Sequence, residues 1–264
     1  MQIIIPYVKS NSGFDELKYA VRSIEEKFKD DFELIIIGEK PEWLNEKATF
    51  IPHKRLTGIH LPNCQDACSK MNTLILSAKI GDEFIITYDD IYFLKKIGIN
   101  DLRKIYALKR KTVDGTSKYA RILKNTLAAL RLRKMTARNF ETHLPRLINK
   151  EKMLKTYQTF LPKKNRLLHF SLYFNHHHFD DKIITISHTQ NHIKAGFYGK
   201  DEKDFSYSND LTKSEIKALL RKSHFLNHNN SGLTPALREI IEEKFPNPSS
   251  FEKIEEKEDK NISD

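Results

Sequence analysis

The chain has only two cysteines, Cys64 and Cys68, among its 264 residues. Two cysteines are too few for a disulfide framework or a structural zinc site, and their number fits a reducing, cytoplasmic setting. The glycine-rich signatures G-x-G-x-x-G and G-x-x-x-x-G-K-S/T are absent, which excludes the usual dinucleotide and P-loop sites. No apolar run approaches the roughly 20 residues of a membrane span, and residues 1–6 do not resemble a signal peptide.

Acidic residues are scarce in one long stretch of the chain. Residues 103–166 carry 19 Lys and Arg against 3 Asp and Glu, and the whole chain has a formal net charge of +10. Such a stretch should attract phosphates, whether on a nucleotide, a lipid, an anionic membrane or a nucleic acid. No recognised nucleic-acid-binding motif is present. We therefore do not expect nucleic acid as the partner, and a peripheral contact at the inner face of a membrane stays open.

The first 95 residues alternate between short apolar runs and amphipathic stretches. The spacing predicts strand, helix, strand, strand, helix and strand over residues 2–8, 14–28, 32–37, 49–52, 66–78 and 82–90. In the first helix, which Ser12 should cap, apolar residues recur at helical spacing. This order is typical of a largely parallel sheet covered by helices. We predict an α/β fold whose first half is a mostly parallel nucleotide-binding sheet of the GT-A or Rossmann-like type.

The chain changes character after Asn100, where strand signals thin out and basic helices dominate. Helices are predicted from about residue 117, over 151–160 and 167–175, after the Thr212 capping box, and after Thr234-Pro235. One further strand is predicted over 182–187. We expect a single catalytic domain over residues 1–252, made of an α/β half (1–95) and a helix-rich basic half (96–252). Residues 253–264 are predicted to be a disordered tail.

Asp89 and Asp90 follow the apolar strand that contains Phe84-Ile85-Ile86. Ligands of open α/β sheets bind beyond the carboxyl ends of the strands, and carboxylate oxygens there suit Mg²⁺ or Mn²⁺ bridging phosphates. The alternative is a solvated turn, because Asp is common in turns. The sequence therefore offers Asp89 and Asp90 as metal ligands without deciding between the two interpretations.

Four groups of segments recur in the order and rough spacing of a known family. They are ELKYAVRSI (16–24) with IIG (36–38) and PEWL (41–44), DDIYF (89–93), RNFETHLPRLI (138–148), and FLNHN (225–229) with FPNPSSFE (245–252). Together they resemble the Stealth family of sugar-phosphate transferases, which includes bacterial capsule polysaccharide phosphotransferases. The family's opening motif is not found, Tyr88 replaces an Asn, and His228 replaces an Asp.

The resemblance implies that a hexose 1-phosphate passes from a nucleotide sugar to an acceptor hydroxyl, with release of a nucleoside monophosphate. The acceptor would be a glycan, such as a capsule or other exopolysaccharide. By family position His143 is the base that takes the acceptor's proton. Asp90 and Arg138 complete the expected catalytic set. The expected substrate-binding residues, which would neutralise or orient phosphates, are Arg22, Arg121, Asn227 and Asn229.

Other readings of the same residues stay open. Arg22 and Arg121 could be surface cations, and His143 could be a satisfied loop histidine. The enzymatic alternative is a GT-A-type glycosyltransferase that releases a nucleoside diphosphate. A protein that binds nucleic acid, lipid or glycan without catalysis is the alternative from another class.

Overall fold

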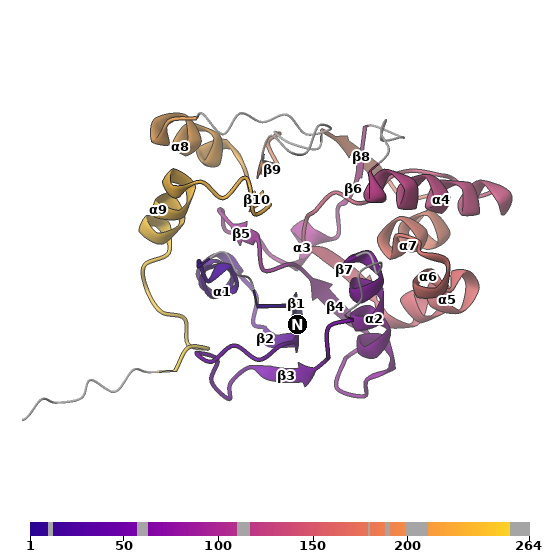
Figure 1. Cartoon of the computed structure of the whole chain (residues 1–264), viewed down its shortest axis with the longest axis horizontal. Coiled ribbons are helices and arrows are strands. Elements are labelled where there is room, and N and C mark those ends of the chain that lie inside the picture. The colour runs from indigo at the N-terminus through magenta and orange to yellow at the C-terminus, as the bar shows by residue number, and fades with distance from the viewer. Residues whose placement is uncertain are drawn as a thin grey trace, which may run out of the picture.

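A five-stranded, mostly parallel sheet forms the centre of the molecule (Figure 1). The computed structural model describes residues 1–9, 13–56, 63–109, 117–178, 180–187, 191–198 and 211–253. The strand order is β3-β2-β1-β4-β7, with β7 antiparallel to β4 and the other neighbours parallel. The strands are β1 (Gln2–Tyr7), β2 (Glu33–Gly38), β3 (Thr49–Pro52), β4 (Glu83–Ile86) and β7 (Arg146–Asn149). The predicted α/β class is confirmed.

Helices cover both faces of this sheet, which explains its continuous apolar strands. Successive side chains of a strand point to opposite faces. Ile3 and Ile5 pack with α1 (Glu16–Lys27), whereas Ile4 packs with α2 (Asn63–Leu76) and with helices from the second half of the chain. The three isoleucines have no exposed surface, and each contributes roughly 1.5–3 kcal/mol of burial energy.

The first helix begins at a different cap from the predicted one. Asp15 is the N-cap, and its side chain accepts a hydrogen bond from the Lys18 N–H. Ser12 lies outside the described residues. The predicted apolar stripe is confirmed, because Leu17, Val21 and Ile24 are fully buried.

The second half contains more strands than the sequence predicts. Two small sheets accompany the central one, β5-β10-β9 and β6-β8. Their strands are β5 (Ile91–Phe93), β6 (Ile105–Leu108), β8 (Ile183–Ile186), β9 (Lys194–Phe197) and β10 (Phe225–His228). Strand β5 lies in the first half, directly after the strand predicted over 82–90. Of the strands of the second half, which include β7, only β8 is predicted. The others were missed because strands of three or four residues are too short to show a clear period.

The predicted helices of the second half are all present, with small shifts at their ends. They are α4 (Lys118–Leu132), α5 (Lys150–Phe160), α7 (His169–His177), α8 (Lys213–Lys222) and α9 (Pro235–Lys244), together with the short α3 (Ile99–Leu102) and α6 (Pro162–Asn165). Figure 1 shows α8 and α9 together at one side of the molecule and α4 to α7 at the other. No helix in the described ranges has the length and apolar character needed to cross a bilayer.

Residues 245–253 fold back on the first half, although their composition resembles a linker. Arg22 on α1 forms a two-pronged ion pair with Glu252, with Nε–Oε1 and Nη2–Oε2 distances of 2.7 and 2.8 Å. Asn45 donates to the Ser250 and Glu252 carbonyls, and the Lys253 N–H donates to the Trp43 carbonyl. This segment is therefore part of the fold. Of the predicted tail over residues 253–264, Lys253 is bound to the first half of the chain, which differs from the prediction, and residues 254–264 lie outside the described residues.

We predict that Glu252→Gln destabilises the protein by about 3 kcal/mol, because it leaves the buried Arg22 guanidinium without its counter-charge. Only 10% of the Arg22 side chain and 5% of the Glu252 side chain are exposed. Burial opposes ionisation of Glu252, but the hydrogen bonds and charge of Arg22 hold its pKa below the ordinary value. The stabilisation is therefore complete at neutral pH and is lost as the pH falls through the pKa of folded Glu252.

Urea denaturation of both proteins at neutral and acid pH measures this difference. Glu243→Gln is the matched control, because Glu243 pairs with Lys217 at 2.8 Å on an exposed surface and should have little effect. A difference between wild type and Glu252→Gln that does not shrink in acid would contradict the assignment.

Candidate active site

The carboxyl ends of three parallel strands meet at one edge of the central sheet. Strands β1, β2 and β4 end at Tyr7, Gly38 and Ile86. The Thr87 N–H still donates to the Ile4 carbonyl at 3.0 Å, so the chain leaves β4 in line with β1. The next residues, Asp89 and Asp90, form the turn before β5. Asp89 and Asp90 therefore lie at the carboxyl edge of the sheet, and their role as metal ligands stays a prediction.

Gly38 lets the ends of β1 and β2 approach closely. Its φ is +132°, and a Cβ there would lie 2.0 Å from the Tyr7 carbonyl oxygen and 3.3 Å from Lys70 Cε. A side chain is therefore excluded by both conformation and space. The freed space is used by the buried Lys70 side chain, whose ammonium pairs with Asp66 at 2.7 Å.

Negative charge is concentrated beside this edge. Burial, the neighbouring Asp90 carboxylate and the Glu16 carboxylate together raise the pKa of Asp89 well above its ordinary value, and the Lys70 charge only partly opposes them. Like charges that share a partly buried site disfavour each other's ionisation. A cation placed here would remove that penalty.

Asp90 forms a close pair with His143, 53 residues further along the chain. His143 Nε2 lies 3.0 Å from Asp90 Oδ1 and 2.9 Å from Oδ2. Burial pushes the pKa of Asp90 upward, but the charge and hydrogen bond of His143 outweigh it, and the pKa lies below its ordinary value. About a third of the His143 side chain is exposed, against 19% of Asp90. The His143 side chain is therefore the more exposed member of the pair, and the Asp90 carboxylate is the more buried one.

The backbone of His143 is strained, and buried groups hold it in place. Its φ is +51°, a left-handed conformation that costs a non-glycine residue about 1–2 kcal/mol. The fully buried Asn227 amide donates to the His143 carbonyl at 2.8 Å. Tyr88 stacks on the imidazole, with ring centroids 5.2 Å apart. Strain that the surroundings maintain in this way is typical of functional sites.

A buried lysine holds Thr142, the residue before His143, in place. Lys194 on β9 has no exposed surface, and its ammonium donates to the Thr142 carbonyl at 2.8 Å. The Tyr198 hydroxyl lies 3.4 Å from that ammonium and donates to Asn227 Oδ1 at 3.1 Å. No ion pair joins Lys194 to a carboxylate within the described ranges. Burial, together with the Arg146 charge, lowers the pKa of Lys194 to about 7, and the Asp90 charge partly opposes this shift.

Arg146, the first residue of β7, is a second buried cation close to Thr142. Its Nη2 donates to the Phe140 carbonyl at 2.8 Å and lies 3.3 Å from Thr142 Oγ1, and the guanidinium lies over the Phe170 ring. The sequence reasoning named neither Arg146 nor Lys194 as a site residue. A signal was present, because each is the single charged residue in a short apolar run, but nothing in the sequence places those runs beside His143.

His228, the last residue of β10, is almost fully buried. Its Nε2 lies 3.1 Å from the Tyr92 hydroxyl, and the two rings stack. Burial lowers the pKa of His228 to about 4, although the Asp90 charge opposes this shift. His228 is therefore neutral at physiological pH and adds no charge to the site.

The other predicted residues are not brought to the Asp90–His143 pair. Arg22 is committed to Glu252, and Asn229 organises the turn after β10, where its Oδ1 accepts from the Gly232 N–H at 2.8 Å. The side chains of Arg121 and Arg138 are exposed. Asn227 reaches the His143 backbone but is buried behind it. No hydrogen bond or ion pair within the described ranges joins Arg22, Arg121 or Arg138 to the pair.

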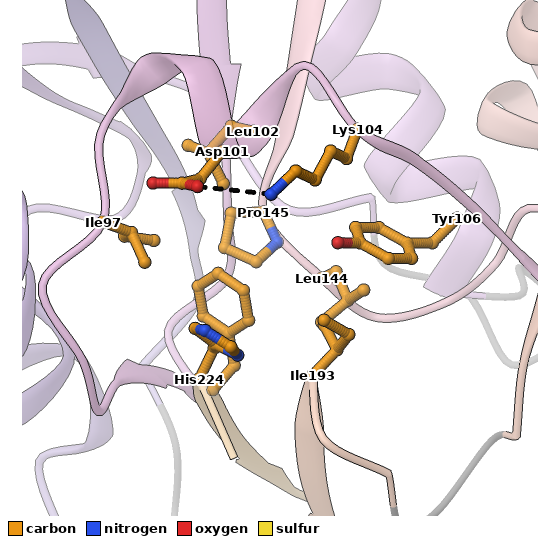
Figure 2. A pocket seen from close by; sticks show the side chains of 10 residues that line it. Ile97, Asp101, Leu102, Lys104, Tyr106, Leu144, Pro145, Ile193 and His224 are labelled. Carbon is orange, nitrogen blue, oxygen red and sulfur yellow. Dashed lines mark hydrogen bonds and ion pairs between the residues drawn. The ribbon is translucent and has the colours of Figure 1, made fainter. Parts of the chain in front are cut away.

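A cavity opens beyond Leu144 and Pro145, which directly follow His143. Figure 2 shows Tyr106, Lys104 and Ile193 converging on Pro145 from different elements. Its volume is about 50 Å³. An adjoining cavity of about 230 Å³ shares Leu144 and Pro145 and extends along β7 past Arg146. The segment that carries His143 therefore borders cavities at Leu144 and Pro145. The hydrogen bonds from Lys194 and Asn227 hold this segment in position.

The donor set for a metal ion is small. In the part of the chain that the structure describes, no three His, Cys, Asp or Glu side chains converge to hold a metal. Mg²⁺ nevertheless fits, because it commonly binds one or two carboxylates together with substrate phosphates and waters. Of the two predicted ligands, Asp89 suits this role, whereas Asp90 uses both oxygens on His143.

We predict that Lys194→Met displaces His143, because the Thr142 carbonyl loses its buried donor and the left-handed backbone relaxes. The imidazole ¹⁵N and ¹H signals of His143 should shift, and the signal of its hydrogen bond to Asp90 should weaken. Lys150→Met is the matched control. The Lys150 ammonium also donates to two carbonyls, those of Ser77 and Ile80 at 2.8 Å each, but Lys150 lies beyond the end of β7 that is farther from His143. Unchanged His143 signals in Lys194→Met would show that Lys194 does not position His143.

We predict that Asp89→Asn stabilises the metal-free protein by roughly 1 kcal/mol, because it removes one of several like charges. Thermal unfolding in EDTA measures this gain. Added Mg²⁺ should then raise the melting temperature of the wild type and not of the variant. The exposed Asp82→Asn serves as the control and should behave as wild type in both conditions. A destabilised Asp89→Asn variant would contradict the view that repulsion from the Asp90 and Glu16 carboxylates disfavours the charge of Asp89.

Comparison with known protein families and curated proteins identifies no family for this chain. No protein-family model and no curated protein sequence matches the chain. Among solved structures, an active-site mutant of LgtC, a GT-A glycosyltransferase, is similar with a TM-score of 0.49 and 10% sequence identity. The match covers 92% of this chain and 95% of that chain. At this level of similarity, no activity, substrate or cofactor is transferred from LgtC to this chain.

Proposed function

We propose that the chain transfers a sugar 1-phosphate from a nucleotide sugar to a hydroxyl group of a glycan or polysaccharide acceptor. The observation that carries this proposal is the Asp90–His143 pair, which stands at the carboxyl edge of a mostly parallel sheet with the histidine partly exposed. The edge suits the nucleotide donor. A histidine oriented by a carboxylate suits removal of a proton from a hydroxyl group.

In the proposed reaction, the two ring nitrogens of His143 have different tasks. Nε2 faces the Asp90 carboxylate, which only accepts hydrogen bonds when ionised, so Nε2 carries the proton. Nδ1 is then the basic nitrogen, and no hydrogen bond within the described ranges occupies it. The acceptor hydroxyl would give its proton to Nδ1, and Asp90 would stabilise the imidazolium that forms.

The proposed reaction breaks one phosphorus–oxygen bond and forms another. The deprotonated acceptor oxygen attacks the phosphorus atom that bears the sugar, and the bond from that phosphorus to the nucleoside phosphate breaks. The products are a phosphodiester-linked sugar and a nucleoside monophosphate. Charge grows on the phosphoryl oxygens during the transfer. The exposed guanidinium groups of Arg121 and Arg138 stay available to neutralise it, whereas Arg22 is held by Glu252.

Asp89 would hold Mg²⁺ or Mn²⁺ together with the donor phosphates. When bound, the metal ion would stabilise the negative charge of the leaving nucleotide. The chain's own part at this position is to supply a carboxylate whose neighbours, Asp90 and Glu16, favour the approach of a cation.

The experiment that tests the proposal is incubation with a panel of nucleotide sugars, Mg²⁺ and a cell-surface glycan extract, with nucleotides read by mass spectrometry. We expect a nucleoside monophosphate and a glycan that has gained a phosphosugar. A nucleoside diphosphate would instead identify the GT-A-type glycosyltransferase that the sequence leaves as the alternative. No product with any donor would favour a binding protein without catalysis.

His143→Ala tests the role of the base. We expect the variant to lose about 10²–10⁴-fold in kcat while its donor affinity, measured by calorimetry, stays near that of the wild type. His224→Ala is the control, since His224 lies in the cavity beyond Pro145 and not at the pair. Loss of donor binding together with a lower melting temperature in His143→Ala would make His143 structural.

A further inference from the structure

Two large leucines project from one end of the molecule. Leu132, at the end of α4, is 84% exposed, and Leu161, which follows α5, is 50% exposed. Among the described residues the only other exposed large hydrophobic side chain is Leu76, on α2. Single exposed leucines are ordinary, but neighbouring ones on one surface call for an explanation.

The ends of α4 and α5 lie against each other. The Arg133 guanidinium, next to Leu132, lies 4.8 Å from the centre of the Phe160 ring, next to Leu161. Apolar side chains of α4 and Phe160 also share one buried cluster. In Figure 1 both helices belong to the group at the side of the molecule opposite α8 and α9. The two leucines therefore belong to one surface.

Cations surround these leucines. The basic leucine surface consists of Leu132 and Leu161 with Arg131, Arg133, Lys134, Lys163, Lys164 and Arg166. All eight side chains are exposed. No ion pair joins any of the six cations to a carboxylate within the described ranges. The nearest acidic residues along the chain are elsewhere, since Glu141 accepts hydrogen bonds from Ser171 and Glu151 lies at the other end of α5.

The backbone of this surface is strained. Four non-glycine residues in the described ranges have positive φ, and three of them lie here: Lys134 at 57°, Leu161 at 47° and Arg166 at 53°. Glycine usually takes such positions at helix ends, because any side chain raises the energy of this conformation. Here the sequence places a leucine and two cations instead. The fourth such residue is His143, in the candidate active site.

We propose that the basic leucine surface docks on an anionic lipid bilayer, with Leu132 and Leu161 inserted among the lipids and the six cations at the headgroups. Aliphatic insertion flanked by basic residues is the pattern of proteins that bind membrane surfaces. A surface for single-stranded nucleic acid would instead expose aromatic rings for base stacking. The inference goes beyond the proposed function and does not depend on it.

Cosedimentation of the full chain with vesicles tests the proposal. We expect binding to vesicles of equimolar phosphatidylcholine and phosphatidylglycerol, weakening as salt rises, and little binding to phosphatidylcholine alone. Replacing both leucines, Leu132→Ser with Leu161→Ser, should reduce binding by at least about tenfold. Leu76→Ser is the matched control, because Leu76 is 65% exposed at the end of another helix, and it should bind as wild type.

A second variant tests the charge. Arg131→Gln, Lys134→Gln and Lys164→Gln together should weaken binding and flatten its salt dependence. The same charge loss on α8, by Lys213→Gln, Lys217→Gln and Arg221→Gln, should not. The proposal is overturned if wild type binds neither vesicle, if the leucine variant binds as tightly as Leu76→Ser, or if the chain prefers RNA to anionic vesicles.

Discussion

The pair of Asp90 and His143 joins the two halves of the chain at one point. Asp90 lies in the turn between β4 and β5 of the first half, and His143 belongs to the segment that enters β7 from the second half. The histidine reaches the carboxylate only because its backbone takes a left-handed conformation, and that conformation depends on buried donors from β9 and β10. The two small strands therefore serve the site although they lie outside the central sheet.

The pair also separates two regions of opposite charge. On one side are Asp89 and Glu16, whose carboxylates crowd together, and on the other are the buried cations Arg146 and Lys194. Burying charge is costly, so neither region is explained by stability alone. In the proposed function, the metal ion that the donor phosphates bring would balance the carboxylates of the first region. The second region holds the segment around Thr142 in place through the hydrogen bond from Lys194 and the contact with Arg146.

The sequence predicts the four parallel strands of the central sheet and the position of Asp89 and Asp90 after one of them, because continuous apolar runs and the rule for strand ends are local signals. It also points to His143, though only through the family resemblance. It does not predict the antiparallel strand β7. It does not reveal Lys194, because a single lysine in an apolar run acquires its meaning from the carbonyl it meets across the fold. For the same reason Arg22 could not be assigned, since its partner Glu252 is 230 residues away along the chain. The short strands of the two small sheets were not predicted because hydrogen bonding to partner strands, and not a local sequence pattern, defines them.

Tyr88 and His228 shape the surroundings of Asp90 in one direction. Tyr88 places an aromatic ring against His143, and His228 places a buried neutral ring against Tyr92. Both side chains add packing surface, and neither supplies a carboxylate oxygen. In the proposed function, a metal ion at Asp89 would therefore depend on the oxygens of the donor phosphates. Asp90 is left to His143, and the packed rings make that pairing the most firmly defined feature of the site.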